Sequence, residues 1–128
     1  MPHRVFLTRL LAAASLAGFV AGCGGTGATG DVDKIQVALS QFDITVTNTS
    51  GGPLANVVAE IAPAGPGTHF VARIGTLANT EKRSISHAGF TDRDSVPFSL
   101  RNAKPTRIIV AGDGVDGKPV RIDVPFKL

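Results

Sequence analysis

Apolar and polar residues alternate with a period of two along most of the chain from residue 34 onward. That period places successive side chains on opposite faces of a β-strand, and no stretch there shows the 3.6-residue period of an amphipathic helix. The alternation predicts about seven short strands. They cover residues 34–39, 42–47, 56–61, 69–74, 82–86, 106–111 and 120–126. We therefore expect an all-β fold, an antiparallel β-sandwich, with a five- or six-stranded barrel as the alternative.

Turn-forming residues separate the predicted strands. Runs rich in Gly, Pro, Asn and Asp occur at 48–53, 63–67 and 113–117. These residue types favour tight connections, so the strands should follow one another through short loops. Leu77 lies between two predicted strands and is expected to fill the core.

The five phenylalanines beyond the N-terminal segment divide into two groups. Phe42, Phe70 and Phe126 fall on the inward phase of their predicted strands. Phe90 and Phe98 flank a loop and have no strand phase to place them. They form either an exposed apolar patch, which is typical of a partner surface, or a cap on one end of the sandwich.

The first 22 residues have the pattern of an export signal. His3, Arg4 and Arg9 give a positive start, and the apolar run 10–20 follows. A membrane-spanning helix needs roughly 20 apolar residues, so this run is too short for a stable anchor. The sequence predicts that segment 1–22 directs export and is then removed.

The segment Val20-Ala21-Gly22-Cys23 resembles the lipobox of bacterial lipoproteins, an aliphatic residue and two small ones before a cysteine. In that family the thiol receives a diacylglyceryl group and the chain is cleaved before the cysteine. The resemblance implies lipid on Cys23, cleavage between Gly22 and Cys23, and attachment to a membrane. Gly24, where an aspartate would imply inner-membrane retention, leans toward an outer membrane, facing the periplasm, in a Gram-negative cell. An ordinary secretory signal with a chance cysteine is the alternative.

Small residues fill the stretch between this cysteine and the first predicted strand. Residues 24–30 are only Gly, Ala and Thr, a composition typical of a flexible linker. Such a linker would hold the folded part roughly 15 Å from the lipid. The sequence therefore predicts a signal at 1–22, a lipidated cysteine with a flexible spacer at 23–32, and one β-sandwich at 33–128.

Two stretches suggest a more specific fold. Residues 42–51 resemble the opening of many bacterial immunoglobulin-like and fibronectin-III-like modules, and Ile74-Gly75-Thr76-Leu77 resembles the later step in which a Leu closes the core. The resemblance implies an immunoglobulin-like sandwich. The chain has one Cys and no Trp, so the disulfide and core tryptophan of antibody domains are missing. A likeness of fold carries no activity with it.

Charge and aromatic content argue against two classes of partner. The chain has 13 Lys and Arg against 10 Asp and Glu, and two of the arginines lie in the predicted signal. The remainder is thus nearly neutral, whereas nucleic-acid binders concentrate positive charge. We expect no nucleic-acid partner. With neither Trp nor Tyr, the chain also lacks the aromatic faces on which sugars usually stack.

Loop aspartates are the candidates for a metal site. Asp113 and Asp116 lie beside glycines, and Asp92 and Asp94 form a second acidic pair. Calcium prefers carboxylate and carbonyl oxygens. The alternative for 113–117 is a hairpin turn, where Asp and Gly are favoured, and the alternative for the second pair is a solvated loop.

The remaining chemistry-bearing residues match no catalytic motif. His69 and His87 are the only histidines after the signal, which is too few for a zinc site. Ser84, Ser86, His87 and Asp92 supply the residue types of a catalytic triad, but they are close in sequence and lack a nucleophile elbow. We expect a non-enzymatic protein with no cofactor and with solvated histidines.

Together these patterns favour a lipoprotein of the bacterial cell envelope, anchored to the membrane through Cys23. Its sandwich would bind another envelope protein or give structural support. A calcium- or small-ligand-binding accessory protein of the envelope is the alternative, and a small envelope hydrolase is a third hypothesis.

Overall fold

A computed structural model describes residues 27–101 and 103–128, so the predicted signal and Cys23 lie outside the described residues. The described part contains eight strands and a short 3-10 helix, His87–Gly89, and none of its helices is long and apolar enough to cross a membrane. The strands are β1 (Thr29–Gly30), β2 (Ile35–Leu39), β3 (Asp43–Asn48), β4 (Leu54–Pro63), β5 (Phe70–Leu77), β6 (Lys82–Ser86), β7 (Pro105–Asp113) and β8 (Pro119–Pro125).

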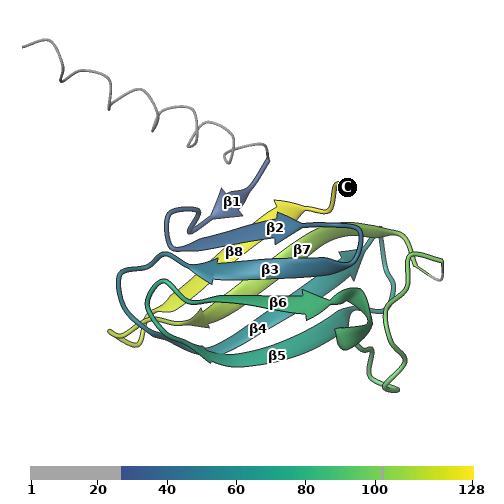
Figure 1. Ribbon diagram of the computed structural model, residues 1–128. Coiled ribbons are helices and arrows are strands. Elements are labelled where there is room, and N and C mark those ends of the chain that lie inside the picture. The colour runs from purple at the N-terminus through teal and green to yellow at the C-terminus, as the bar shows by residue number, and fades with distance from the viewer. Residues whose placement is uncertain (1–26, 102) are drawn as a thin grey trace, which may run out of the picture.

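The strands form two sheets that pack face to face (Figure 1). The larger sheet has the order β1-β8-β7-β4-β5, and the smaller has the order β2-β3-β6. Every pairing is antiparallel. Two separate sheets make a sandwich, so the predicted antiparallel β-sandwich is confirmed and the barrel alternative is wrong.

Alternation along the strands correctly identified the side that faces the core. In β4 and β5 the inward side chains are buried, and Leu77, which was expected to lie between two strands, is buried as the last residue of β5. These buried residues are Val57, Ala59, Ile61, Phe70, Ala72, Ile74 and Leu77. Their burial removes apolar surface from water, which is the main favourable contribution to folding.

Phe42 departs from the prediction. It was expected to face inward, but 77% of it is exposed. The cause lies in the turn before β3, where the Ser40 hydroxyl accepts hydrogen bonds from the backbone N–H groups of Phe42 and Asp43. This local turn leaves Phe42 outside the strand, because β3 begins only at Asp43.

The predicted flexible spacer is shorter than expected. Thr29 and Gly30, inside the segment expected to be a random coil, form β1 and pair with Asp123 and Ile122 of β8. Asp31 extends the attachment, because its N–H donates to the carbonyl of Arg121 and its carboxylate accepts the Arg121 N–H. The folded body therefore includes β1 and extends before the predicted boundary at residue 33.

The two ends of the sandwich differ in how they are closed, and we name each after its central buried residue. The Asn48 end comprises the connections 31–34, 49–53, 78–81 and 114–118. The Phe98 end comprises residues 40–42, 64–69, 87–101, 103–104 and 126–128. The described chain also begins there, since a Cβ built on Gly27 would lie 3.0 Å from Cγ of Pro125, the last residue of β8.

The outer edge of β5 is partly occupied by other segments of the chain. Val71 exchanges two backbone hydrogen bonds with Thr91, at 2.8 and 3.1 Å. Further along, the Arg83 guanidinium donates to the carbonyl of Ile74 at 3.2 Å and to the Glu81 carboxylate at 2.8 Å. These contacts satisfy backbone groups that an edge strand otherwise leaves open.

Candidate functional site

The predicted lipidation site cannot be placed in the fold, because Gly22 and Cys23 lie outside the described residues. The nearest described residue, Gly27, follows Cys23 by four positions. The other predicted site residues all lie within the described part, and they distribute between the two ends of the sandwich.

Asp113 and Asp116 serve the hairpin that joins β7 to β8. The Asp113 carboxylate accepts a hydrogen bond from the side-chain amide of Asn56 at 3.1 Å. The Asp116 carboxylate accepts the Lys118 N–H at 3.0 Å, and the backbone of the hairpin closes between Gly114 and Lys118. Among residues 27–101 and 103–128, no group of three His, Cys, Asp or Glu side chains is arranged to hold a metal. Residues 113–117 therefore form the hairpin connection that was the alternative to a calcium site.

The second acidic pair lies at the opposite end. One carboxylate oxygen of Asp92 accepts the N–H groups of Asp94 and Val96, at 2.8 and 2.9 Å. This arrangement closes a tight turn in which the side chain replaces a backbone acceptor. Asp92 and Asp94 therefore lie in a loop, which was the alternative to a calcium site. They lie at the opposite end of the sandwich from Asp113 and Asp116.

The triad residue types are engaged separately. The Ser84 hydroxyl pairs with the Thr45 hydroxyl across β3 and β6, at 2.7 Å, and Ser86 is the last residue of β6, where it pairs with Asp43 of β3. The His87 ring packs near Phe98 and Phe126, with ring centroids 5.8 and 6.0 Å away, and its buried Nε2 has no hydrogen-bond partner in the described residues. His87 was expected to be solvated, and this packing corrects that expectation. The Asp92 carboxylate binds backbone N–H groups instead of an imidazole.

His69 lies on the polar side of the fold, as the alternation predicted. Its Nδ1 pairs with the Glu60 carboxylate, and 45% of the His69 side chain is exposed. An exposed side-chain pair of this kind contributes little to stability and forms no binding site by itself.

The predicted apolar patch at Phe90 and Phe98 is wrong, because these side chains are 0% and 2% exposed. The alternative, in which they cap one end of the sandwich, is correct. The Phe98 N–H donates to the Phe90 carbonyl at 2.7 Å, which closes the intervening loop and turns both rings inward. The Phe98 ring meets Phe70 and Phe126 edge-on, at centroid distances of 5.3 and 6.1 Å.

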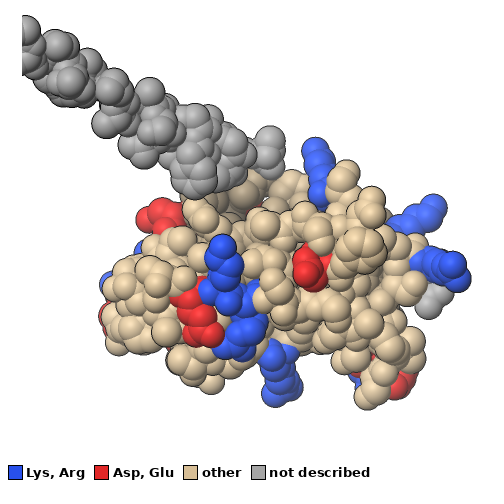
Figure 2. All heavy atoms as spheres, viewed as in Figure 1, with Lys and Arg blue, Asp and Glu red and all other residues tan. Residues whose placement is uncertain are grey.

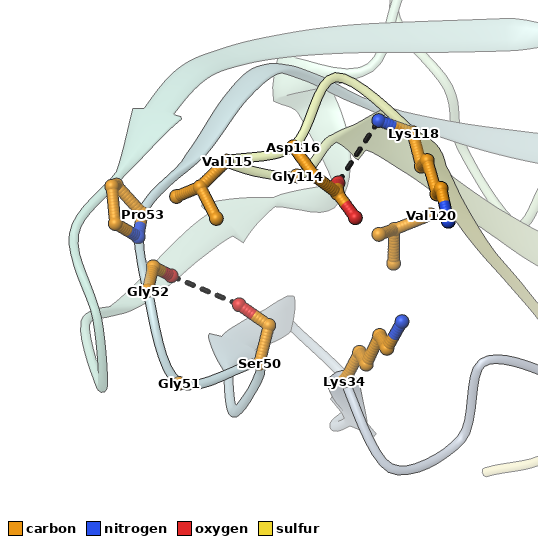
Figure 3. Close-up of a pocket in the computed structure, with 10 residues that line it drawn as sticks. All are labelled: Lys34, Ser50, Gly51, Gly52, Pro53, Gly114, Val115, Asp116, Lys118 and Val120. Atoms are coloured by element: carbon orange, nitrogen blue, oxygen red, sulfur yellow. Dashed lines mark hydrogen bonds between the residues drawn. The ribbon is translucent and has the colours of Figure 1, made fainter.

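A small cleft of about 180 Å³ opens at the Asn48 end. Three connections that are distant in sequence form its walls. Lys34 comes from the β1–β2 connection, residues 50–53 from the β3–β4 loop, and residues 114–118 from the β7–β8 hairpin. In Figure 3 the charged ends of Lys34, Lys118 and Asp116 face one shared space, and Val115 lies beside Pro53 and Gly52.

A buried amide holds one wall of this cleft in place. Asn48 is 0% exposed, and its Nδ2 donates to the carbonyls of Gly52, Leu77 and Ala78 at 2.8 to 3.0 Å. Its Oδ1 accepts the N–H and the hydroxyl of Ser50, at 2.9 and 2.7 Å. The β3–β4 loop is therefore fixed by hydrogen bonds that a buried polar side chain must make.

The charges in the cleft favour an ionised carboxylate beside two ammonium groups. The backbone N–H of Lys118 lowers the pKa of Asp116, and the positive charges of Lys118 and Lys34 lower it further. Among the residues that line the cleft, two lysines and one aspartate leave one net positive charge, which suits a small ligand with an anionic group, although the loops around it carry further acidic side chains. Of the charged residues in this cleft, the sequence singled out only Asp116, as a calcium candidate, because the fold alone brings the lysines to it.

A second cleft, of about 480 Å³, lies at the Phe98 end between the β4–β5 loop and the segment that precedes β7. Its lining is mostly apolar and includes Pro63, Phe70 and Val96, and its charged members are Asp92 and Lys104.

Comparison of the chain with protein-family models, curated proteins and solved structures finds no match.

Proposed function

We propose that this chain is a lipid-anchored protein of the bacterial cell envelope whose β-sandwich acts without catalysis, in binding another envelope protein or in structural support. The observation that carries the proposal is Val20-Ala21-Gly22-Cys23, with its unique cysteine, followed six residues later by β1. A leader, an attachment point and a folded body follow one another in the order that a lipoprotein requires.

The anchor would be strong and the link short. Each buried methylene of an acyl chain contributes about 0.8 kcal/mol, so two or three chains give a durable attachment. Gly27 lies four positions after Cys23. An extended chain of that length spans at most about 14 Å, which would keep the sandwich close to the bilayer.

The arrangement of polar side chains supports a non-enzymatic role. Most charged pairs of the described part link neighbouring strands or turns, as in Arg107 with Asp123 at 2.9 Å and Arg83 with Glu81 at 2.8 Å. Ser84, His87 and Asp92, which are among the candidate triad residues, each have structural contacts of their own.

The test is to express the full chain and its Cys23→Ser variant in a bacterium that processes lipoproteins. We expect intact mass spectrometry to show a mature protein that begins at Cys23 and carries acyl groups, and membranes to retain it. The serine variant, which cannot be acylated, should be free of membranes. An unmodified full-length wild-type product, or equal distribution of the two proteins, would contradict the proposal.

The cleft between Lys34 and Lys118 favours a second candidate function, binding of a small anionic ligand. A ligand that binds only the folded state must raise the midpoint of unfolding. Inorganic phosphate and acetate are suitable probes, with Lys118→Ala as the control. An unchanged midpoint with both probes would remove this candidate.

A further inference from the structure

The end of the sandwich from which the chain leaves toward Cys23 differs in charge from the opposite end. Counting the connections outside the strands, the Phe98 end has four basic and two acidic side chains, whereas the Asn48 end has two basic and four acidic. The basic residues of the Phe98 end are Arg93, Arg101, Lys104 and Lys127. Figure 2 shows blue side chains projecting from this end, on the right of the view.

Exposed apolar side chains accompany this positive charge. Phe42 is 77% exposed, Leu128 63%, and Val96 and Leu100 each 46%. They are not needed to close the core, because the buried rings of Phe90 and Phe98 already do so. Two of them directly adjoin basic residues in the sequence, as Leu100 adjoins Arg101 and Leu128 adjoins Lys127.

The exposed residues belong to one continuous end of the molecule. The His87 N–H donates to the Phe42 carbonyl at 3.0 Å, which ties the β2–β3 turn to the 3-10 helix. The His87 ring lies against Phe98 and Phe126, and Phe126 leads to Leu128. Gly27 approaches Pro125 at the same end, since a Cβ built on Gly27 would lie 3.0 Å from the Pro125 Cγ.

We propose that the Phe98 end lies against an anionic lipid surface. Leu100 and Phe42 would contact the interfacial region, while Arg101 and Lys104 approach headgroup phosphates. Apolar side chains mixed with basic ones are the composition by which peripheral segments bind anionic bilayers. The inference rests on the proposed lipidation of Cys23, which holds Gly27 within about 14 Å of the bilayer.

The charge distribution favours lipid over a second copy of the chain. Two Phe98 ends brought together would oppose like charges, which destabilises an interface. The exposed apolar side chains also come from separate segments and alternate with charged residues, whereas the centre of a protein interface is depleted in charge.

The test places a reporter at each end of the lipidated protein. Acylated Cys23 has no thiol, and the chain has no other cysteine, so Leu100→Cys and Val115→Cys each introduce one site for an environment-sensitive fluorophore. Val115 is the matched control, since it is an apolar residue of the opposite end and is 74% exposed. Both proteins are reconstituted into phosphatidylethanolamine vesicles with phosphatidylglycerol as the anionic component and with lipid-borne spin labels as quenchers.

We expect lipid quenching at position 100 and none at position 115. Replacing phosphatidylglycerol by zwitterionic phosphatidylcholine, or introducing Arg101→Glu with Lys104→Glu, should lower the quenched fraction at position 100, by roughly ten-fold for the double charge reversal. The corresponding change at the opposite end, Lys34→Glu with Lys118→Glu, should leave quenching at position 100 unchanged.

Two outcomes would overturn the proposal. Equal, weak quenching at the two positions in a protein that is demonstrably acylated and vesicle-bound would show that this end does not face lipid. A label at position 100 that is shielded without lipid quenching, to a degree that depends on protein concentration, would assign the surface to a second copy. Failure of the proposed function would be visible earlier, as a protein without acyl groups that does not enter vesicles.

Discussion

The Asn48 end and the Phe98 end close the same sandwich by different chemistry. At the first, a buried amide makes five hydrogen bonds to nearby loops. At the second, the rings of Phe70, Phe98 and Phe126 meet edge-on, with His87 beside them. Directional hydrogen bonds fix the conformation of the loops, whereas ring packing fills volume and leaves the outer side chains free to carry charge. At the Phe98 end, the side chains that close the core are therefore different from those that form the exposed surface.

The largest test of this comparison is Phe98→Ala. Removing a buried ring should lower the free energy of unfolding by about 3–5 kcal/mol, because a cavity replaces the contacts with Phe70 and Phe126. Urea unfolding followed by circular dichroism measures this, as the chain has no Trp. The control is Phe42→Ala, at the same end but exposed, which should change stability by less than about 0.5 kcal/mol. Similar losses of unfolding free energy for the two variants would contradict the conclusion that ring packing closes this end of the core.

The next test is Asn48→Ala at the opposite end. The variant leaves the carbonyls of Gly52, Leu77 and Ala78 without their donor, at an expected cost of roughly 2–3 kcal/mol. Amide hydrogen exchange should accelerate in the β3–β4 loop more than in β8. Asn79→Ala, an exposed asparagine of the same end, should stay within about 0.5 kcal/mol of the wild type. A loop that exchanges as slowly as before would contradict the role of the amide.

A smaller effect is expected where β1 joins the body. Gly30 has a φ of 99°, and a Cβ there would collide with the carbonyl oxygen of Arg121. Gly30→Ala should therefore cost about 1–3 kcal/mol and expose residues 27–32 to protease. Gly51→Ala is a matched control with a φ of 93° but nothing within 4 Å of the new Cβ, so it isolates the backbone strain from the collision. Equal effects would show that β1 contributes no specific attachment.

The smallest effect is a difference in acid response between the ends. A hydrogen bond from Arg83 and one from the Ala78 N–H lower the pKa of Glu81, and the Lys118 N–H lowers that of Asp116. Groups with lowered pKa stabilise the fold above their ordinary values of 4.5 and 3.8, and this stabilisation is lost as the pH falls through the lowered values.

The Glu81→Gln, Asp116→Asn double variant should therefore be slightly less stable than the wild type near neutral pH and equal to it in strong acid. Unfolding midpoints across the acid range measure this difference. Gln41→Ala, at the Phe98 end, introduces no change in titration and should give a pH-independent difference. A gap between the double variant and the wild type that persists in strong acid would refute the assignment.

Periodicity predicted most of the sandwich because an alternating strand exposes one face and buries the other. Val57, Ala59 and Ile61 face the core for that reason. The prediction failed where a side chain changed the local path of the chain, as at Ser40, whose hydroxyl ends the β2–β3 turn and displaces Phe42. It also missed β1, since two residues of small side chain carry no periodic signal.

The candidate sites were harder to predict because they depend on contacts distant in sequence. Phe90 and Phe98 had no strand phase, and their burial follows from the pairing of Thr91 with Val71 on another strand. Lys34 and Lys118 gave no signal, because 84 positions separate them in the chain. Asp113 and Asp116 were correctly considered for a turn, since turn chemistry is local.

The protected edge of β5 would have a consequence for the proposed lipid-anchored form, whose copies would be confined to a surface. Neighbouring copies in two dimensions collide repeatedly in similar orientations, and an open strand edge would then recruit another strand and start a fibre. Thr91 and the Arg83 guanidinium already occupy the outward-facing groups of Val71 and Ile74. Copies could therefore crowd together along this side without polymerising.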